Sequence, residues 1–473
     1  MMIDVRGETV KIKGNLRRFA VWAAAVALVV AMIAGQAAAA LADGMEIGLA
    51  DAVGMALRQN KMVLAAESSA SALRADARAA FGSYLPKVSL EERYMRTDNP
   101  TYAFMSKLNQ SKIAQEDFDP SLLNDPSTAR DFQTSINVEQ LIYSREASMG
   151  IAAARKQAEA ARFDLERTRE DVALGVIKAY LGVITSRQYL EAAAKAVEDA
   201  TEHQRIAKAR YDAGLGLYPD TLRTEVFLKE AQERLISANK GNELAKRGLG
   251  LMLGLDAPVD ALDEDITYEP GDINAYMDSA DGRSDLLAMQ KKVEAAGKAL
   301  SMKKGKHLPV LGLGGSYQLN DESQAFGNEG ESYVVMAFLK WNLFDGLQTS
   351  NEVASAAHRK REAEQYYEGM KQQVAFKVHD AYLGIEEARL GLELAESRVK
   401  LAEESARIVA SRYENSLATI VDLLDSQSAL NAARADVVAK HNSYMVSIET
   451  LKYESGLLLA EYEPGQNGGS NDK

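Results

Sequence analysis

The sequence has no cysteine among its 473 residues. Disulfide bonds, a cysteine-linked lipid anchor and thiolate metal sites are therefore excluded, and stability must come from packing and assembly. Histidine is scarce as well, since the five histidines are scattered and none shows metal-ligand or zinc-protease spacing. Because a glycine-rich phosphate loop is also missing, we expect no cofactor, no metal site and no catalytic residue. An enzyme is the least favoured class of function.

A net positive charge is also absent, because the chain carries a formal charge of -13. Residues 1–42 combine a basic start, an apolar core at 19–33 and the small residues Ala40 and Ala42, which is the pattern of a signal peptide. A membrane anchor is the alternative, but the apolar core is short for a spanning helix. Cleavage removes five basic and two acidic side chains, and this more acidic mature chain argues against nucleic acid as a partner.

Proline is rare, and its placement predicts where long helices can run. None of the nine prolines lies between Ser127 and Tyr218 or between Val310 and Glu463. Strong helix formers dominate residues 146–212 and 347–414, and proline would break such helices in their interior. Each segment would extend roughly 100 Å at 1.5 Å per residue. Short breaks then reverse the chain, so each segment is expected to be one arm of a helical hairpin.

What the sequence does contain is a long internal repeat. Tyr180-Leu181-Gly182 returns as Tyr382-Leu383-Gly384, and Arg210-Tyr211 returns as Arg412-Tyr413, both at an offset of 202 residues. Each copy pairs two strands with a long helical hairpin. The predicted organisation is a signal peptide at 1–42, a first repeat at 43–254 (β-hairpin about 84–143, helical hairpin about 145–254), an acidic linker or equatorial element at 255–285, a second repeat at 286–458 (β-hairpin about 308–343, helical hairpin about 346–458) and a disordered tail at 459–473.

The predicted strands alternate apolar and polar side chains, as Ile136 and Val138 do with Ser135 and Asn137. Runs of about ten such residues fit transmembrane strands, although an ordinary half-buried soluble sheet has the same alternation. Four strands cannot close a barrel, so membrane strands would have to be pooled, giving eight from two copies or twelve from three. Aromatic residues near the strand ends are predicted to lie at the membrane interface: Tyr84, Tyr143, Trp341 and Phe344.

Three stretches resemble the TolC family of trimeric outer-membrane efflux and secretion channels, within a similarity that covers residues 45–458. They are Tyr84-Leu85-Pro86, Asn342-Leu343-Phe344-Asp345-Gly346 and Thr419-Ile420-Val421-Asp422-Leu423-Leu424-Asp425. The resemblance implies a mostly α-helical fold with a membrane β-barrel. A trimer would form a 12-stranded barrel continued by a long periplasmic α-helical barrel, in the outer membrane of a Gram-negative bacterium. The loop of the first strand hairpin, which is about 20 residues longer than that of the second, would be extracellular.

The resemblance also implies function and partners. The homotrimer would be the outer-membrane duct of a tripartite efflux or type I secretion system, in contact with outer-membrane lipid. Its partners would be a periplasmic adaptor and an inner-membrane transporter of the RND or ABC type, with no nucleic acid. The alternative is a periplasmic coiled-coil scaffold or adaptor protein whose strands form a soluble sheet.

The residues at the second hairpin tip carry the site prediction. By resemblance, Asp422 and Asp425 form a carboxylate ring that constricts the pore and favours cations. Helix capping is the alternative role for these carboxylates. Tyr413 and Asp220 match a hydrogen-bonded pair that latches the closed tips. The sequence departs from the family where a gate arginine and its threonine partner would stand, at Ala418 and Pro219.

Overall fold

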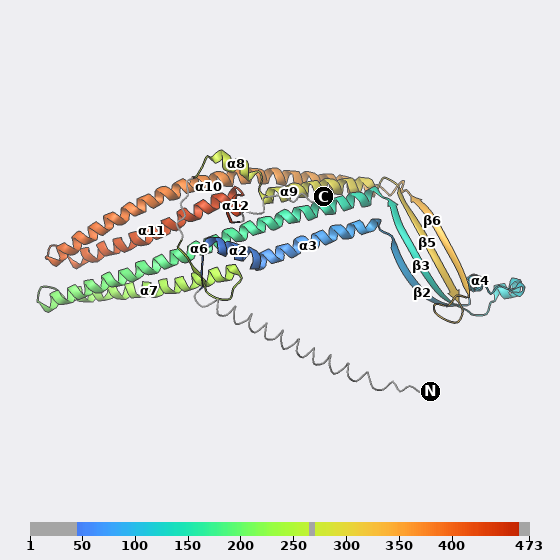
Figure 1. Cartoon of the computed structure of the whole chain (residues 1–473), viewed down its shortest axis with the longest axis horizontal. Coiled ribbons are helices and arrows are strands. Elements are labelled where there is room, and N and C mark those ends of the chain that lie inside the picture. Colours follow the sequence, from blue (N-terminus) through green and yellow to red (C-terminus); the bar gives the residue numbers. More distant parts are fainter. Residues whose placement is uncertain (1–44, 264–269, 463–473) are drawn as a thin grey trace, which may run out of the picture. The chain divides into compact units, whose positions relative to one another are not determined.

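A computed structural model describes residues 45–263 and 270–462 (Figure 1). The predicted signal peptide and the end of the predicted tail lie outside the described residues. The chain divides into two compact units. One contains residues 66–165 and 284–372, and the other contains residues up to 65, 166–283 and those from 373 onward. Within the described ranges, no helix is both long and apolar enough to cross a membrane.

The first of these units contains a four-stranded antiparallel sheet with the order β2-β3-β5-β6, whose strands lie side by side in Figure 1. The first repeat supplies β2 and β3, the second supplies β5 and β6, and the pairing of β3 with β5 joins the two repeats. The predicted strand pairs are thereby confirmed. Their bounds are β2 (Lys87–Thr97), β3 (Ala129–Tyr143), β5 (Val310–Asp321) and β6 (Gly330–Lys340).

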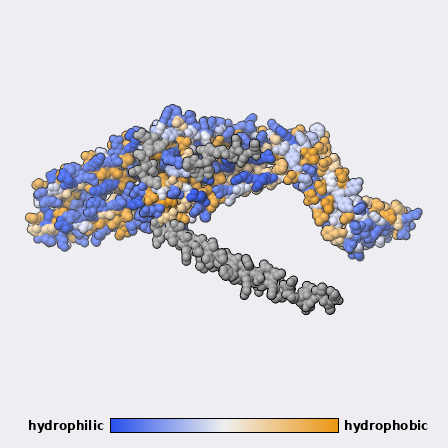
Figure 2. Space-filling view, viewed as in Figure 1, coloured by the Kyte–Doolittle hydropathy of each residue, from blue (hydrophilic) through white to orange (hydrophobic). Residues whose placement is uncertain are grey.

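The two outer strands expose their side chains on both faces. Nearly every residue of β2 and β6 is exposed, including Val88, Leu90, Val335 and Leu339. Figure 2 shows apolar residues along the strands of this unit. The apolar pattern therefore does not build an ordinary one-sided core within one chain.

A glycine in β5 has a specific packing role. Gly312 pairs with Phe338 of β6, and a Cβ atom added to Gly312 would lie 2.3 Å from the Phe338 ring. The aromatic ring therefore occupies the space that any larger side chain at position 312 would need. Covering a strand glycine with an aromatic cross-strand neighbour pins the register of such a pair.

The long loop between β2 and β3 is itself folded. It contains α4 (Pro100–Asn109), η2 (Gln115–Phe118) and α5 (Pro120–Asn124). Both α-helices begin with a side-chain cap followed by proline, which is a strong helix start signal. Gln110 donates to Asp131 Oδ1 at 2.9 Å and Asn320 donates to Asp131 Oδ2 at 2.8 Å, so a buried polar cluster fastens the loop to the sheet.

Helices α3 (Lys61–Phe81) and α9 (Ser284–Gly305) lead into the first strand of each pair. Glu352, near the start of the second long helix, accepts from Lys306 at 2.8 Å and from Lys303 at 2.9 Å. These two lysines lower the pKa of Glu352 to about 2. The ion pairs therefore join the end of α9 to the helix that follows the strands.

The two helical hairpins make up most of the second unit, while residues 145–165 and 348–372 of their long helices belong to the first. The long helices are α6 (Arg145–Asp212) and α10 (Gln348–Glu414), with 68 and 67 residues, which confirms the helices predicted from proline placement. The returning helices are α7 (Tyr218–Leu253) and α11 (Ile420–Glu454), and each lies beside its long helix in Figure 1. Smaller elements complete this unit: β1 (Glu46–Ile47), α2 (Leu49–Gln59), β4 (Asp260–Ala261), α8 (Ile273–Ala280) and α12 (Leu458–Tyr462).

Regular structure is present in the predicted acidic linker or equatorial element and at the start of the predicted tail. The acidic segment 255–285 contributes β4, which pairs in parallel with β1, and also α8. The tail, expected to be disordered from residue 459, begins instead with the helix α12. Leu458 is fully buried there, and Lys452 donates to Glu461 at 2.6 Å, so packing and an ion pair hold this turn.

Candidate functional site

The two helical hairpins end in the same backbone turn. At the first tip Gly214 has φ +74° and the N–H of Leu215 donates to Arg210 O at 2.8 Å. At the second tip, 202 residues later, Ser416 has φ +63° and the N–H of Leu417 donates to Arg412 O at 2.8 Å. This is the left-handed helix end that satisfies the last carbonyl groups of a helix. The sequence repeat therefore extends to the hydrogen bonds of the tips.

Ser416 holds a backbone conformation that usually requires glycine. A left-handed non-glycine residue costs about 1 kcal/mol or more. The hydroxyl of Ser416 accepts from Arg210 Nη2 at 2.8 Å, and Gly214 has no side chain to make such a bond. The strained serine thus provides an acceptor that the first tip lacks.

Arg210 joins the two hairpins at their tips. Its Nη1 donates to Tyr413 O and to Glu414 O, both at 2.8 Å, in addition to the bond with Ser416. Its guanidinium also lies over the Tyr413 ring, 4.9 Å from the ring centroid. Bonds from a charged donor to carbonyl oxygens are stronger than neutral ones. Reasoning from the sequence did not assign Arg210 a role, although the Arg-Tyr repeat singled it out.

Tyr413 is buried beside Arg210, with 4% of its surface exposed. It forms an apolar cluster with Ile420 and Leu423 of its own hairpin, and Ile206 of the first hairpin packs against this cluster. Burial raises the pKa of its hydroxyl, and the neighbouring Asp220 carboxylate raises that pKa further. Within the described part of the chain no hydrogen bond joins Tyr413 to Asp220. The predicted latch pair is therefore adjacent, and its hydrogen bond remains a prediction.

Asp422 caps helix α11. Its Oδ2 accepts from the N–H and from the hydroxyl of Thr419, at 2.8 and 2.7 Å, and Thr419 Oγ1 accepts from the Asp422 N–H at 3.2 Å. The N–H bond and then the hydroxyl bond lower the pKa of Asp422, and the charge of Arg412 lowers it further. The capping role left open by the sequence is thus present. Capping keeps the carboxylate ionised and fixed at the tip, which is compatible with a role in the pore.

Asp425 lies one turn further along and is exposed. It lines a groove of about 420 Å³ between α7 and α11, together with Leu222, Arg223 and Val421. Asp422 and Asp425 are three residues apart in the first two turns of α11, a spacing that brings side chains near each other on one side of a helix.

Further along the helices from the tips, a network of polar side chains also joins the two hairpins. Gln427 on α11 donates to Asp199 Oδ2 at 2.9 Å, and its amide oxygen lies 3.2 Å from His203 Nε2. Arg434 donates to the same Asp199 oxygen at 3.0 Å. Buried polar groups that bond to one another favour a specific helix register. The hairpins are therefore held by a directional contact as well as by apolar packing.

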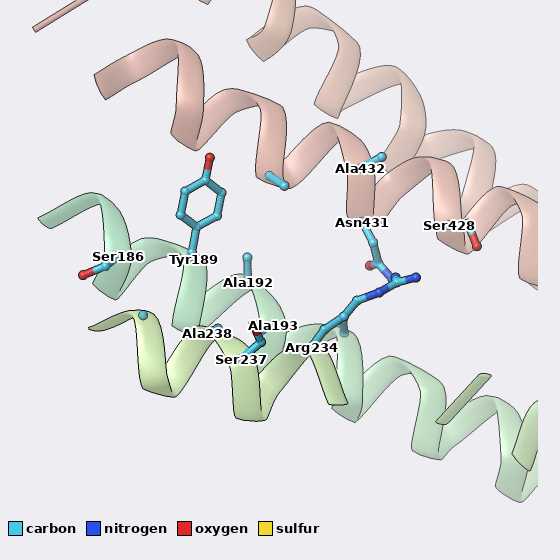
Figure 3. A pocket seen from close by; sticks show the side chains of 13 residues that line it. Ser186, Tyr189, Ala192, Ala193, Arg234, Ser237, Ala238, Ser428, Asn431 and Ala432 are labelled. Atoms are coloured by element: carbon cyan, nitrogen blue, oxygen red, sulfur yellow. The ribbon is translucent and has the colours of Figure 1, made fainter. Parts of the chain in front are cut away.

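A second groove lies on α6, α7 and α11, further from the tips, and is shown in Figure 3. Its volume is about 600 Å³, and most of its lining side chains are alanine, serine or glycine. Tyr189, Arg234 and Asn431 supply larger polar groups, and no carboxylate or histidine lines it. Across the described residues no cluster of histidine and carboxylate ligands forms a metal site. This groove has the character of a helix-packing surface.

The predicted interface aromatics lie at the junctions between strands and helices. Tyr84 Oη donates to Ser144 O at 2.7 Å, and Trp341 Nε1 donates to His307 O at 3.0 Å. Tyr143 and Phe344 are exposed, at 46% and 78%. The polar atoms of Tyr84 and Trp341 bond to backbone carbonyl groups, and the rings of Tyr143 and Phe344 are exposed. Aromatic side chains with an apolar ring and a bonded polar atom are typical of membrane–water interfaces.

Comparisons with known proteins agree with these features. The family model described as "Outer membrane efflux protein" matches residues 52–255 and 276–456. The alkaline protease secretion protein AprF of Pseudomonas aeruginosa is 22% identical over 345 residues, covering 69% of this chain and 70% of the relative. The outer membrane efflux protein BepC of Brucella suis is 22% identical over 357 residues, covering 72% of this chain and 78% of the relative.

Solved structures share the fold. The Campylobacter jejuni CmeC outer membrane channel matches with a TM-score of 0.73 at 17% identity, covering 87% of this chain and 86% of that one. The outer membrane protein VceC of Vibrio cholerae matches with a TM-score of 0.72 at 16% identity, covering 86% and 96%.

Proposed function

The chain belongs to the outer membrane efflux protein family of TolC-like channels, and from this premise we propose that three copies form a gated duct through the outer membrane. The sheets of the three copies close a 12-stranded barrel in the membrane. The helical hairpins form a periplasmic tube that ends at the tips. Within a tripartite system, the duct receives substrates from an inner-membrane transporter through a periplasmic adaptor. We infer no catalytic activity.

The open sheet carries this proposal. The sheet ends at β2 and β6, which pair only with β3 and β5 within the described residues. Backbone groups at a free edge cannot be left unsatisfied in lipid, so each edge requires another strand. Joining β6 of one copy to β2 of the next satisfies the backbone groups of both edges. Three sheets give a lumen wide enough for water, whereas eight strands leave an interior just filled by side chains.

The tips supply the gate. Arg210 contributes the guanidinium that Ala418 lacks, and it reaches the second tip from the first hairpin. Tyr413 and Asp220 add the latch once their separation closes to a hydrogen bond. Three copies would bring six carboxylates, from Asp422 and Asp425, to one opening. A carboxylate ring attracts cations and repels anions.

The names of the relatives suggest two classes of exported substrate. AprF is named for protease secretion and BepC for efflux, so we propose that this chain exports substrates by one of these two routes. The inner-membrane partner proposed for this duct is a transporter of the RND type or of the ABC type.

The proposal is tested by locating and weighing the intact protein. We expect extraction from the outer membrane only with detergent, a native mass of three chains and single-channel conductance in planar bilayers. Recovery as a detergent-free periplasmic protein would instead support the coiled-coil scaffold or adaptor. A detergent-extracted monomer without conductance would reject the duct.

A further inference from the structure

We propose that Arg412 of each copy binds the first hairpin tip of the adjacent copy, over the ring of Tyr211 and against the carbonyl oxygens of Tyr211 and Asp212. This inference rests on the proposed trimer and deepens it, because it names a contact that holds neighbouring copies together. The partner is a second copy of this chain.

The two hairpin tips are structurally equivalent. Their helix ends share the same hydrogen bonds at an offset of 202 residues. The side-chain pairs repeat as well: Arg205 bonds Glu202 at 2.6 Å, and Arg407 bonds Glu404 at 2.7 Å. Position 412 therefore has the same backbone setting on the second hairpin as Arg210 has on the first.

A closed ring of three copies fixes which hairpins are neighbours. First and second hairpins must alternate, so each second hairpin has a first hairpin of its own copy on one side and that of a neighbour on the other. Arg210 projects from the first hairpin onto the second hairpin of the same chain. Near-equivalent packing around the ring then directs Arg412 onto the neighbouring copy's first hairpin.

The residues that would meet are accessible within one chain. Arg412 is exposed, and its side chain has no hydrogen bond or ion pair to the described residues. Tyr211 is 43% exposed, whereas Tyr413 at the equivalent position is 4% exposed and covered by Arg210. Tyr211 is tilted against Tyr218, with ring centroids 5.7 Å apart, which leaves part of the ring surface accessible to a guanidinium.

The two contacts differ in strength. Ser416 gives Arg210 a side-chain acceptor, but the equivalent residue for Arg412 is Gly214, which has none. The contact between copies therefore has one bond fewer than the contact within a copy. We infer that the tips separate between copies before the two hairpins of one copy separate from each other.

Cross-linking tests the contact directly, because the natural chain has no cysteine. The variant with Tyr211→Cys and Arg412→Cys is treated as the assembled full-length protein with a short bismaleimide. We expect covalent dimers and trimers on a denaturing gel, and no such ladder from either single variant. Arg210→Cys with Tyr413→Cys is the matched pair, and it should cross-link within one chain without raising the mass.

Failure of this inference can be distinguished from failure of the proposed function. A native trimer without a ladder from the Tyr211→Cys and Arg412→Cys pair overturns the inference alone. Absence of a trimer overturns both.

A double-mutant cycle separates the contact from a local effect on Asp422, whose pKa Arg412 also lowers. We expect R412Q to raise closed-state conductance roughly tenfold, with little change for R407Q on the same helix. The effect should persist in a D422N background and vanish in a Y211A background. Loss of the effect in D422N, with persistence in Y211A, would overturn the inference.

Discussion

Replacing Arg210 by glutamine tests the contact that joins the two hairpins of one chain. Glutamine keeps a hydrogen-bonding amide but is shorter and uncharged, so it cannot reach Tyr413 O, Glu414 O and Ser416 Oγ together. The ring of Tyr413 also loses the cation above it. We expect the tip to open more often while the hairpin helices remain folded.

The size of the effect follows from the bonds that are lost. Arg210 makes three bonds of 2.8 Å to the second tip. A hydrogen bond to a charged group contributes roughly 1.5–3 kcal/mol, but three bonds from one half-buried side chain are not additive. We therefore expect a loss of roughly 2–3 kcal/mol per tip, which shifts the closing equilibrium roughly 30- to 150-fold.

Two measurements check this expectation. Closed-state conductance in planar bilayers should rise, and hydrogen exchange at the Ser416 and Leu417 amides should quicken by a similar factor. Arg205→Gln is the matched control, because Arg205 lies on the same helix and pairs only with Glu202 among the described residues. Equal conductance and exchange in the wild type and Arg210→Gln would refute the assigned role, as would an equal change in the control.

Three further predictions concern the tips and the strand junction. Asp422→Asn combined with Asp425→Asn should lower cation selectivity and weaken block by multivalent cations; an unchanged reversal potential under a salt gradient would reject the carboxylate ring. Tyr413→Phe should raise the resting conductance by removing the hydroxyl that would bond Asp220 in the proposed latch, and a resting conductance equal to wild type would contradict that pairing. Glu352→Gln should lower the thermal unfolding midpoint at pH 7, because the folded-state pKa of Glu352 lies at about 2, below its ordinary 4.5. This stabilisation is complete above pH 4.5 and is lost as pH falls toward 2, so the two midpoints should converge over that range; a difference that stays constant with pH would contradict the ion-pair assignment.

The sequence predicted the long elements well, because their signals are local. The absence of proline located α6 and α10, and alternation located the four strands. The loop helices α4 and α5 were missed, although Asn99-Pro100 and Asp119-Pro120 carry the capping signals that begin them.

The tip contacts were only partly predictable. Asp422 and Thr419 lie three residues apart, so their mutual capping was foreseeable as the alternative role. Arg210 and Ser416 lie 206 residues apart, and their contact depends on how two hairpins pack. Such a pairing leaves no trace in the local sequence, apart from the repeat that places an arginine at equivalent positions.

The exposed edges of β2 and β6 have a consequence for biogenesis. Until the copies of the proposed trimer meet, each chain would present two strand edges that are unpaired within the described residues and carry apolar side chains such as Leu90 and Val335. Such edges invite aggregation, since any other extended chain can pair with them. In the proposed trimer, this hazard would last until the three sheets close. If the proposed trimer forms, protection by a periplasmic chaperone or late ordering of the sheet at the membrane would keep these edges from pairing wrongly before the barrel closes.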